Sequence, residues 1–358
     1  MNKILILALS GIGDALMFTP ALKLLKADMP GAQIDALVMY KGVKDMYERL
    51  PYVNKTIYFD FIKEGPLKSF AFVLGIRKKY DISINVYPSN RWEYNLINYL
   101  IGAPKRAGVT YLRKNNENLG WLNNIKIVES DTRHNVQTNI LLIEELLGKK
   151  FNEELNLEFP LTDSDHAYAV KFLSENNISS NDTVVGFHPG SAVLKNHIKR
   201  RWEPEKFAEL GRNLINEKGA KILIFGGPEE NELKEQIKNE INLPGCFTVN
   251  SGNLAESAAL MKNCSLFISN DSSLMHVAAA LKLKTIAIIG PTNPSYIHPW
   301  KTEHRIVTLN LECSPCFIYS PRPLICFRDD VKFKCINELT VDMVYSESMK
   351  FMHKTSIF

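Results

Sequence analysis

The sequence predicts two α/β domains, each a doubly wound parallel sheet with helices on both faces. Its 358 residues are enough for two domains at roughly 150 residues each. Continuous apolar runs, typical of strands buried on both faces, alternate with segments of helical periodicity. This alternation weakens between residues 149 and 165 and then resumes. We therefore place an N-terminal domain at residues 1–160 and a second domain at residues 161–336.

In the first domain, strands that alternate with helices predict a parallel sheet. The expected strands are residues 3–9, 33–39, 55–59, 81–87 and 105–109. Apolar residues at helical spacing separate these runs, and Gly148 ends an amphipathic helix that begins near His134. Around residues 105–135 the pattern is polar and contains turn residues, so we expect a loop after the last strand.

The second domain repeats the alternation. Its expected strands are residues 183–189, 220–227, 246–249, 265–270 and 285–290. Its expected helices are residues 204–219, 228–241, 254–264 and 273–282.

Composition excludes some classes of function. The net charge of +4 is small for this length, which argues against a nucleic-acid binder but allows a local basic patch facing an anionic substrate or membrane surface. No run of about 18 apolar residues predicts a membrane span. Gly11, Gly13 and Asp14 interrupt the apolar start, and no small-residue cleavage site follows. We therefore expect no signal peptide and a cytoplasmic protein.

The first motif, Ser-Gly-Ile-Gly-Asp at residues 10–14, joins the first strand to the first helix. Glycines let a ligand approach the backbone closely, and Asp14 would lie at the carboxyl end of the sheet, where open α/β folds bind ligands. Asp14 could equally cap the helix. The third glycine of a dinucleotide fingerprint is replaced by Leu16, which disfavours an NAD-dependent oxidoreductase.

A second motif, His-Pro-Gly-Ser, ends the first strand of the second domain. Gly190 and Ser191 offer backbone N–H groups and a hydroxyl, which commonly build anion sites. The loop that follows contains Lys199, Arg200 and Arg201. A solvated basic loop is the alternative, but its position directly after the turn favours contact with a diphosphate.

Three further strand ends of the second domain carry polar residues. After residues 220–227, Glu230 either complements a helix dipole or binds ribose hydroxyls. The next polar turn, suited to phosphate or ribose at a helix N-terminus, holds Asn270, Asp271, Ser272, Ser273 and His276. The last strand ends near Thr292, which we expect to be exposed. Polar turns at consecutive strand ends indicate one binding edge.

Taken in order, these motifs resemble glycosyltransferase family 9, the bacterial heptosyltransferases of the lipopolysaccharide core. The resemblance rests on residues 11–22, 188–191, 200–202, 226–230, 270–281 and 290–294. It implies a GT-B fold, in which two Rossmann-like domains face a central cleft, with the donor on the C-terminal domain and the acceptor on the N-terminal one. It also implies an inverting transfer from an ADP-heptose-like donor, with no metal or other cofactor required.

The resemblance further implies roles for individual residues. Asp14 would be the general base, and Arg200, where similar enzymes commonly carry Lys, would neutralise the leaving diphosphate. The donor-binding residues it implies are His188, Gly190, Ser191, Lys199, Arg201, Gly227, Glu230, Asn270, Asp271, Ser272, Ser273 and His276. Where the family often has Gly, this chain has Ser273. A C-terminal helix, within residues 337–358, would pack back on the N-terminal domain.

The acceptor is expected to be a lipopolysaccharide core or another glycolipid, which would bring the protein to the inner face of the membrane. Gly13, Arg91 and Arg113 are candidate acceptor-binding residues, although a solvated basic surface also explains the arginines. The alternatives to a transferase are a nucleotide-sugar epimerase of similar fold and a non-catalytic nucleotide-sugar binding protein.

Four cysteines near the C-terminus follow a C-x2-C-x9-C-x8-C spacing. They are Cys313, Cys316, Cys326 and Cys335. The close first pair is a metal-ligand spacing, so a structural zinc, a disulfide and free thiols are all open interpretations. Cys246 and Cys264 are expected to be thiols of the core.

Overall fold

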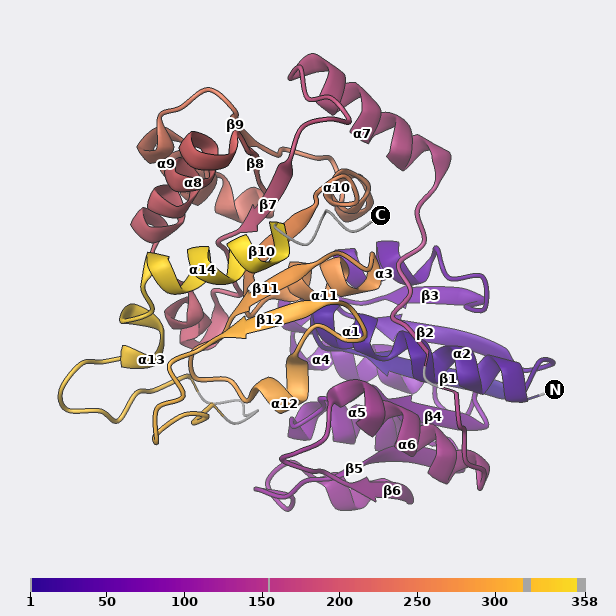
Figure 1. Ribbon diagram of the computed structural model, residues 1–358. Helices are drawn as coiled ribbons and strands as arrows, with labels where there is room; N and C mark the ends of the chain where they lie inside the picture. The colour runs from indigo at the N-terminus through magenta and orange to yellow at the C-terminus, as the bar shows by residue number, and fades with distance from the viewer. Residues whose placement is uncertain (1, 154, 318–322, 353–358) are drawn as a thin grey trace. The chain divides into compact units, whose positions relative to one another are not determined.

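The computed structural model describes residues 2–153, 155–317 and 323–352. The chain divides into two compact units, the first ending at Pro160 and the second beginning at Leu161. In Figure 1 the first unit runs from indigo to magenta and the second from magenta to yellow.

The first unit contains a parallel sheet of six strands in the order β3-β2-β1-β4-β5-β6. Their bounds are β1 (Lys3–Ala8), β2 (Gln33–Val38), β3 (Lys55–Tyr58), β4 (Ile82–Asn85), β5 (Lys105–Thr110) and β6 (Ile125–Val128). This is the Rossmann order, whose switch point lies between β1 and β4. The prediction missed β6, an edge strand with only half of its residues partly buried, and placed a loop there.

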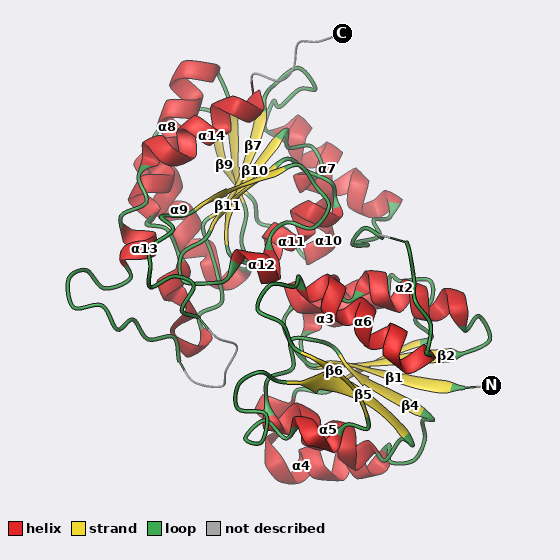
Figure 2. Ribbon diagram, turned by 60° about the horizontal axis from the view of Figure 1, so that its bottom comes forward, coloured by secondary structure: helices red, strands yellow, loops and turns green. Residues whose placement is uncertain are grey.

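Helices cover both faces of this sheet. They are α1 (Ile12–Met17), α2 (Thr19–Asp28), α3 (Lys41–Tyr47), α4 (Phe61–Gly75), α5 (Trp92–Ile101) and α6 (Asn135–Leu147), with a 3-10 turn η1 (Gly120–Leu122). Figure 2 shows α4 and α5 on one face and α2, α3 and α6 on the other. His134 caps the start of α6, and left-handed Gly148 ends it, as expected of a glycine C-cap.

The second unit repeats the architecture, with strand order β12-β11-β10-β7-β8-β9. Its strands are β7 (Val184–His188), β8 (Lys221–Ile224), β9 (Cys246–Thr248), β10 (Leu266–Asn270), β11 (Thr285–Ile288) and β12 (His304–Val307). Here the switch point lies between β7 and β10. The prediction missed the edge strand β12, in which Arg305 is exposed and only Val307 is buried.

The second unit contains the four predicted helices, each slightly shorter than expected, and further helices that were not predicted. They are α7 (Asp163–Glu175), α8 (Pro204–Lys218), α9 (Asn231–Ile241), α10 (Leu254–Met261), α11 (Ser273–Ala280), α12 (Pro294–Ile297), α13 (Lys334–Asn337) and α14 (Val341–Met352), with 3-10 turns η2 (Leu194–Arg200) and η3 (Pro228–Glu230). The helix α7 lies at the predicted domain boundary, where no helix was expected.

The C-terminal helix α14 packs on the second unit, to which it belongs, whereas we expected it to pack back on the N-terminal domain. It contacts α8, β10, β11 and β12, and Val341, Val344 and Phe351 are part of the hydrophobic core of the second unit. Burial of this apolar stripe against the sheet explains its position. Residues 353–358 of the predicted tail lie outside the described residues.

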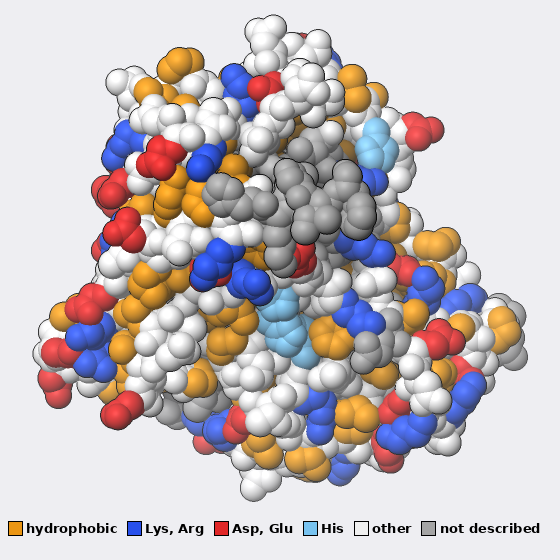
Figure 3. Space-filling view, viewed as in Figure 1, with side chains coloured by type: hydrophobic (Ala, Val, Ile, Leu, Met, Phe, Trp, Pro, Cys, Tyr) orange, Lys and Arg blue, Asp and Glu red, His pale blue; other side chains and the backbone are white. Residues whose placement is uncertain are grey.

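The surface is mixed in character. On the face in Figure 3, acidic, basic and apolar side chains are interspersed. In the described part of the chain, no helix is both long enough and apolar enough to cross a bilayer.

Candidate active site

The predicted donor residues gather at the switch point of the second unit. There β7 and β10 are parallel neighbours, with Ser269 in register with His188. The turns after both strands therefore meet at the same edge, which is where open α/β sheets bind ligands. His188, Asn270 and Asp271 are all buried at this edge.

His188 contacts two other predicted residues, Ser272 and Glu230. Its Nδ1 lies 2.7 Å from the hydroxyl of Ser272, and its Nε2 lies 3.2 Å from Oε2 of Glu230. Burial alone would raise the pKa of Glu230, but the bond to His188 and the N–H of Gly227 outweigh it, so the pKa is lowered. Glu230 is therefore an ionised, buried carboxylate.

Glycine is required at position 190 for space. A Cβ at Gly190 would lie 1.8 Å from Oε1 of Glu230, so any side chain there would displace the carboxylate. Arg201 also donates to Oε1 of Glu230, at 3.1 Å. The carboxylate of Glu230 therefore already accepts hydrogen bonds from three protein groups: His188, Arg201 and, at 3.0 Å, the N–H of Gly227. Any bond to a ribose hydroxyl would be added to these three.

The basic loop is held in place by hydrogen bonds to the strand ends. Ser191 Oγ donates to the carbonyl of His197, so its hydroxyl supports the loop. Asn270 links the turn after β7 to the end of the basic loop, because it donates to the carbonyl of Pro189 and accepts from the N–H of Trp202.

Arg200 forms a buried ion pair with Asp271, whose Oδ2 accepts from its Nη1 at 2.6 Å. The same oxygen accepts from the hydroxyl of Thr292, also at 2.6 Å. Thr292 is only 2 % exposed, so the prediction that it is exposed is wrong. It fixes Asp271, and the sequence could not indicate that pairing.

Two N–H donors beside this ion pair have no hydrogen-bond partner among the described residues. The first is Nε of Arg200, which is buried. The second is Nε2 of His197, as the tautomer of this ring shows. Its Nδ1 lies 3.3 Å from Nη2 of Arg200. A guanidinium can only donate, so Nδ1 accepts, and Nε2, which is buried and unpartnered, carries the proton. Buried N–H donors are nearly always satisfied, which makes this a site for an anionic acceptor of hydrogen bonds.

Phe317, from a distant part of the chain, packs against Arg200 and His197, the two residues with unpartnered N–H groups. Its ring lies 5.4 Å from the guanidinium of Arg200 and meets the imidazole of His197 edge-on. Sequence reasoning missed both His197 and Phe317. A histidine three residues before Arg200 in a basic loop was the available signal for the first, whereas nothing in the sequence links Phe317 to the loop.

His276 is fully buried in the first turns of α11. Burial, together with the charge of His298, lowers its pKa to about 4, so its ring is neutral. Its Nδ1 has no partner among the described residues. Ser273, at the start of the same helix, is half-buried.

The buried His276 predicts loss of stability in mild acid. Between pH of about 6.5 and 4 the unfolded chain binds a proton at this position and the folded chain does not, so stability falls as pH falls. With 1.36 kcal/mol per pKa unit, the loss is about 3 kcal/mol. Urea unfolding at several pH values should show a shallower decline in His276→Asn than in the unsubstituted protein. Equal slopes for the two proteins would contradict the prediction.

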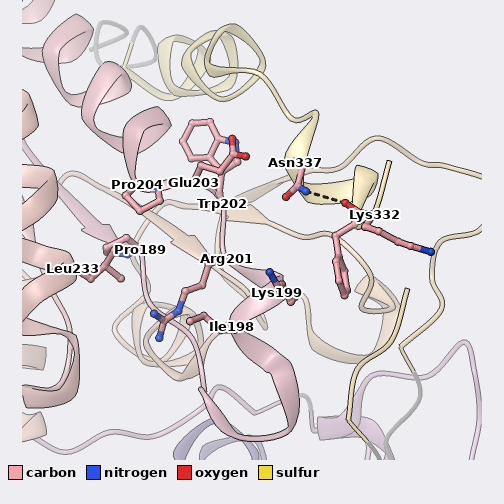
Figure 4. A pocket seen from close by; sticks show the side chains of 11 residues that line it. Pro189, Ile198, Lys199, Arg201, Trp202, Glu203, Pro204, Leu233, Lys332 and Asn337 are labelled. Atoms are coloured by element: carbon pink, nitrogen blue, oxygen red, sulfur yellow. Dashed lines mark hydrogen bonds between the residues drawn. The ribbon is translucent and has the colours of Figure 1, made fainter. Parts of the chain in front are cut away.

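A cavity of about 650 Å³ lies beside the basic loop (Figure 4). It is lined by Pro189, Ile198, Lys199, Arg201, Trp202, Glu203, Pro204, Leu233, Lys332, Phe333 and Asn337. Of the predicted donor residues, Lys199 and Arg201 line it, whereas His188, Arg200 and Asp271 do not. The buried ion pair of Arg200 and Asp271 is therefore not part of the cavity lining.

In the first unit, the switch point brings Asp14 and Arg91 to one place. Gly11 is the N-cap of α1, Asp14 lies in its first turn, and Gly13 is buried. Burial raises the pKa of both Tyr40 and Tyr94, the charge of Arg91 opposes that rise, and the charge of Asp14 adds to it. Because the charges of Asp14 and Arg91 act on the same two tyrosines, the four side chains are neighbours.

The arginines proposed for the acceptor differ in their surroundings. Arg91 lies over the ring of Tyr94, at 5.4 Å, and pairs with Glu93. Arg113 is exposed and binds Asp131 through both ends of its guanidinium, an arrangement that explains it as a surface ion pair.

The four C-terminal cysteines are free thiols. The described residues, which include all four, contain no group of three or more His, Cys, Asp or Glu side chains placed to hold a metal ion. Hydrogen bonds from Arg328 and from the N–H of Phe333 reach Cys313 and Cys326 instead. The zinc and disulfide interpretations are therefore not supported. Cys246 and Cys264 are buried, as predicted, and burial raises the pKa of both.

Comparison with known proteins identifies the family. The model of "Glycosyltransferase family 9 (heptosyltransferase)" matches residues 70–322, most of the chain. The chain belongs to glycosyltransferase family 9. It is therefore a glycosyltransferase, and the matched range contains the whole donor edge of the second unit but not Asp14.

Individual relatives agree with this assignment. Lipooligosaccharide heptosyltransferase 2 of Haemophilus influenzae is 27% identical, over 86% of this chain and 88% of that protein. Two solved structures from Escherichia coli are similar in fold. The ADP-heptose lipopolysaccharide heptosyltransferase II has a TM-score of 0.72 at 22% identity, covering 98% and 99% of the two chains. A heptosyltransferase with ADP has a TM-score of 0.69 at 19% identity, with the same coverage. The predicted GT-B fold is thus confirmed.

Proposed function

We propose that this glycosyltransferase moves a heptose from ADP-heptose to a lipopolysaccharide core acceptor, with inversion at the transferred carbon. The observation that carries the proposal is the pair of buried, unpartnered N–H donors at Arg200 and His197. A sugar diphosphate supplies the acceptor oxygens and negative charge that such donors require. The names of the similar heptosyltransferases support the choice of sugar and nucleotide.

In the proposed reaction, an acceptor hydroxyl attacks the anomeric carbon of the heptose from the face opposite the diphosphate. Asp14 takes the hydroxyl proton as the new C–O bond forms. The bond from the anomeric carbon to the diphosphate oxygen breaks, and ADP leaves with the bonding electron pair. Arg200, held by Asp271, stabilises the charge that develops on the leaving oxygen.

The donor is proposed to lie along the edge that includes Gly190, Asn270 and Ser273. His188, Ser191, Asn270 and Ser272 bond to protein groups, so we assign them to positioning the turns. Lys199 is exposed beside the site and would add positive charge near the diphosphate. The acceptor is proposed to lie near Gly13, Asp14 and Arg91. Because lipopolysaccharide precursors are lipid-anchored, the enzyme would work at the cytoplasmic face of the membrane.

The test is a panel of nucleotide sugars offered with truncated lipopolysaccharide acceptors. We expect ADP release and a product one heptose heavier only with ADP-heptose, and an anomeric configuration opposite to that of the donor. Interconversion of the donor without any acceptor would instead support an epimerase. Tight donor binding with no product on any acceptor would support a binding protein.

A further inference from the structure

Helix α4 is apolar on two opposite faces, although it lies on the surface of the first unit. One face, with Phe61, Phe72 and Val73, packs into the hydrophobic core, where Phe72 stacks on Phe59 at 4.1 Å between ring centroids. The other face is exposed to solvent. A helix that is hydrophobic all round is normally buried, so the exposed face indicates a further partner.

The exposed face is a continuous stripe. Leu67, Phe70 and Leu74 are 87%, 52% and 41% exposed, and their spacing of three and four residues puts them on one side of a helix. Ile62, also largely exposed, precedes a kink at Gly65, whose φ of 77° lies in the left-handed region. In the second unit, by contrast, the exposed Val170 lies on α7 and the exposed Phe327 lies outside the helices and strands. Single exposed apolar residues need no explanation, whereas a stripe does.

Cations border the stripe at both ends. Lys63 and Lys68 lie on the helix, and the exposed Arg77, Lys78 and Lys79 follow it directly. The only acidic side chain within α4 is Glu64, which pairs with Lys68. Residues 62–79 therefore carry five basic groups against one acidic group.

The neighbouring helix α5 also carries exposed aromatic residues. The helices α4 and α5 lie together on one face of the sheet (Figure 2). Trp92 and Tyr99 on α5 are about half exposed, and the guanidinium of Arg106 lies over the ring of Tyr99. Exposed Trp and Tyr beside Lys and Arg are characteristic of protein surfaces at the headgroup level of a bilayer.

We propose that the outer face of α4, formed by Ile62, Leu67, Phe70 and Leu74, rests on an anionic lipid bilayer, with residues 77–79 contacting the headgroups. Charge complementarity favours an anionic bilayer as the partner. The apolar stripe can contact the acyl region, and the basic residues around it can contact the negatively charged headgroups. A second copy of the chain would bring the five cations of each stripe together. The lipid-anchored acceptor of the proposed function would bring the protein to such a bilayer, whereas the exposure and charge of residues 62–79 do not depend on the transfer reaction.

Vesicle sedimentation with the full chain tests this surface without donor or acceptor. We expect binding to vesicles of one part phosphatidylglycerol to two parts phosphatidylcholine, weaker binding at high salt, and little binding to phosphatidylcholine alone. The double variant Leu67→Ser/Phe70→Ser should reduce the partition coefficient by about tenfold or more. The triple variant Arg77→Gln/Lys78→Gln/Lys79→Gln should also reduce it, and should weaken its salt dependence.

The matched control is Val170→Ser/Phe327→Ser, which removes two apolar side chains of the second unit that are 68% and 84% exposed. It should bind vesicles like the unsubstituted protein. Because Leu67 and Phe70 are largely exposed, the α4 variants should keep their melting temperature and their turnover of a soluble, delipidated acceptor. No binding to anionic vesicles, equal loss in control and α4 variants, or loss of a dimer in the α4 variants would each overturn the proposal. Failure of the transfer reaction itself would show in the soluble assay and leave the vesicle result unchanged.

Discussion

Asp14→Asn is expected to lower kcat by about 10²–10⁴-fold while leaving the affinity for the donor unchanged. That range is typical of a lost general base. The amide is nearly the same size as the carboxylate but cannot accept the proton of the acceptor hydroxyl. Donor affinity should persist because the donor atoms we assign lie on the second unit, whereas Asp14 belongs to α1 of the first.

Single-turnover kinetics with titrated donor would separate these quantities. The loss of the acidic limb of the kcat/KM pH profile in Asp14→Asn would assign that limb to this carboxyl. Asp45→Asn is the matched control, since Asp45 is an exposed carboxylate on α3 of the same unit. If Asp14→Asn kept full turnover, Asp14 would not be the base, and another group would have to accept the proton of the acceptor hydroxyl.

The sequence predicted the two sheets because strands buried on both faces are nearly continuous apolar runs. Residues 3–9 are a run of this kind, and they correspond to the central strand β1. The missed strands, β6 and β12, are short edge strands with mixed burial. Their pairing depends on the neighbouring strand more than on their own residues, so the local pattern carries little signal.

The binding edge was predictable for a topological reason. In a parallel sheet all carboxyl ends meet at one edge, so polar turns after successive strands converge. The sequence could not predict which side chains pair across that edge. Arg200 and Asp271 are 71 positions apart, and His188 and Glu230 are 42 apart. The sequence also could not separate residues that shape the turns, such as Ser191, from atoms left available to a ligand, such as Nε of Arg200.

The position of α14 shows a different limit. Its apolar periodicity correctly predicted a helix, but an apolar stripe specifies only that the helix needs a partner surface. The stripe packs on α8 and the sheet of the second unit. The same reasoning applies to α4, whose sequence is apolar and whose structure leaves one of its two apolar faces without a partner among the described residues.

Arg200→Ala should weaken donor binding by about 10–100-fold and also lower kcat. Hydrogen bonds to charged groups contribute roughly 1.5–3 kcal/mol, and the variant removes both the charge and the unpartnered Nε–H. The effect on kcat arises because negative charge on the diphosphate grows as the glycosidic bond breaks, so the interaction is stronger in the transition state than in the bound donor. Titration calorimetry with ADP and steady-state kinetics would measure the two effects separately.

Two comparisons make the Arg200 result specific. Arg200→Lys keeps a cation for Asp271 but loses the planar fork and its Nε–H, so its donor affinity should fall between those of the alanine variant and the unsubstituted protein. Lys262→Ala removes an exposed cation from the same unit and controls for net charge. The alanine variant also leaves Asp271, 6% exposed, without its cation, so a lower melting temperature is expected in Arg200→Ala and not in Arg200→Lys. Unchanged kinetics in Arg200→Ala would transfer the role to another basic residue of the loop, with Lys199 as the first to test.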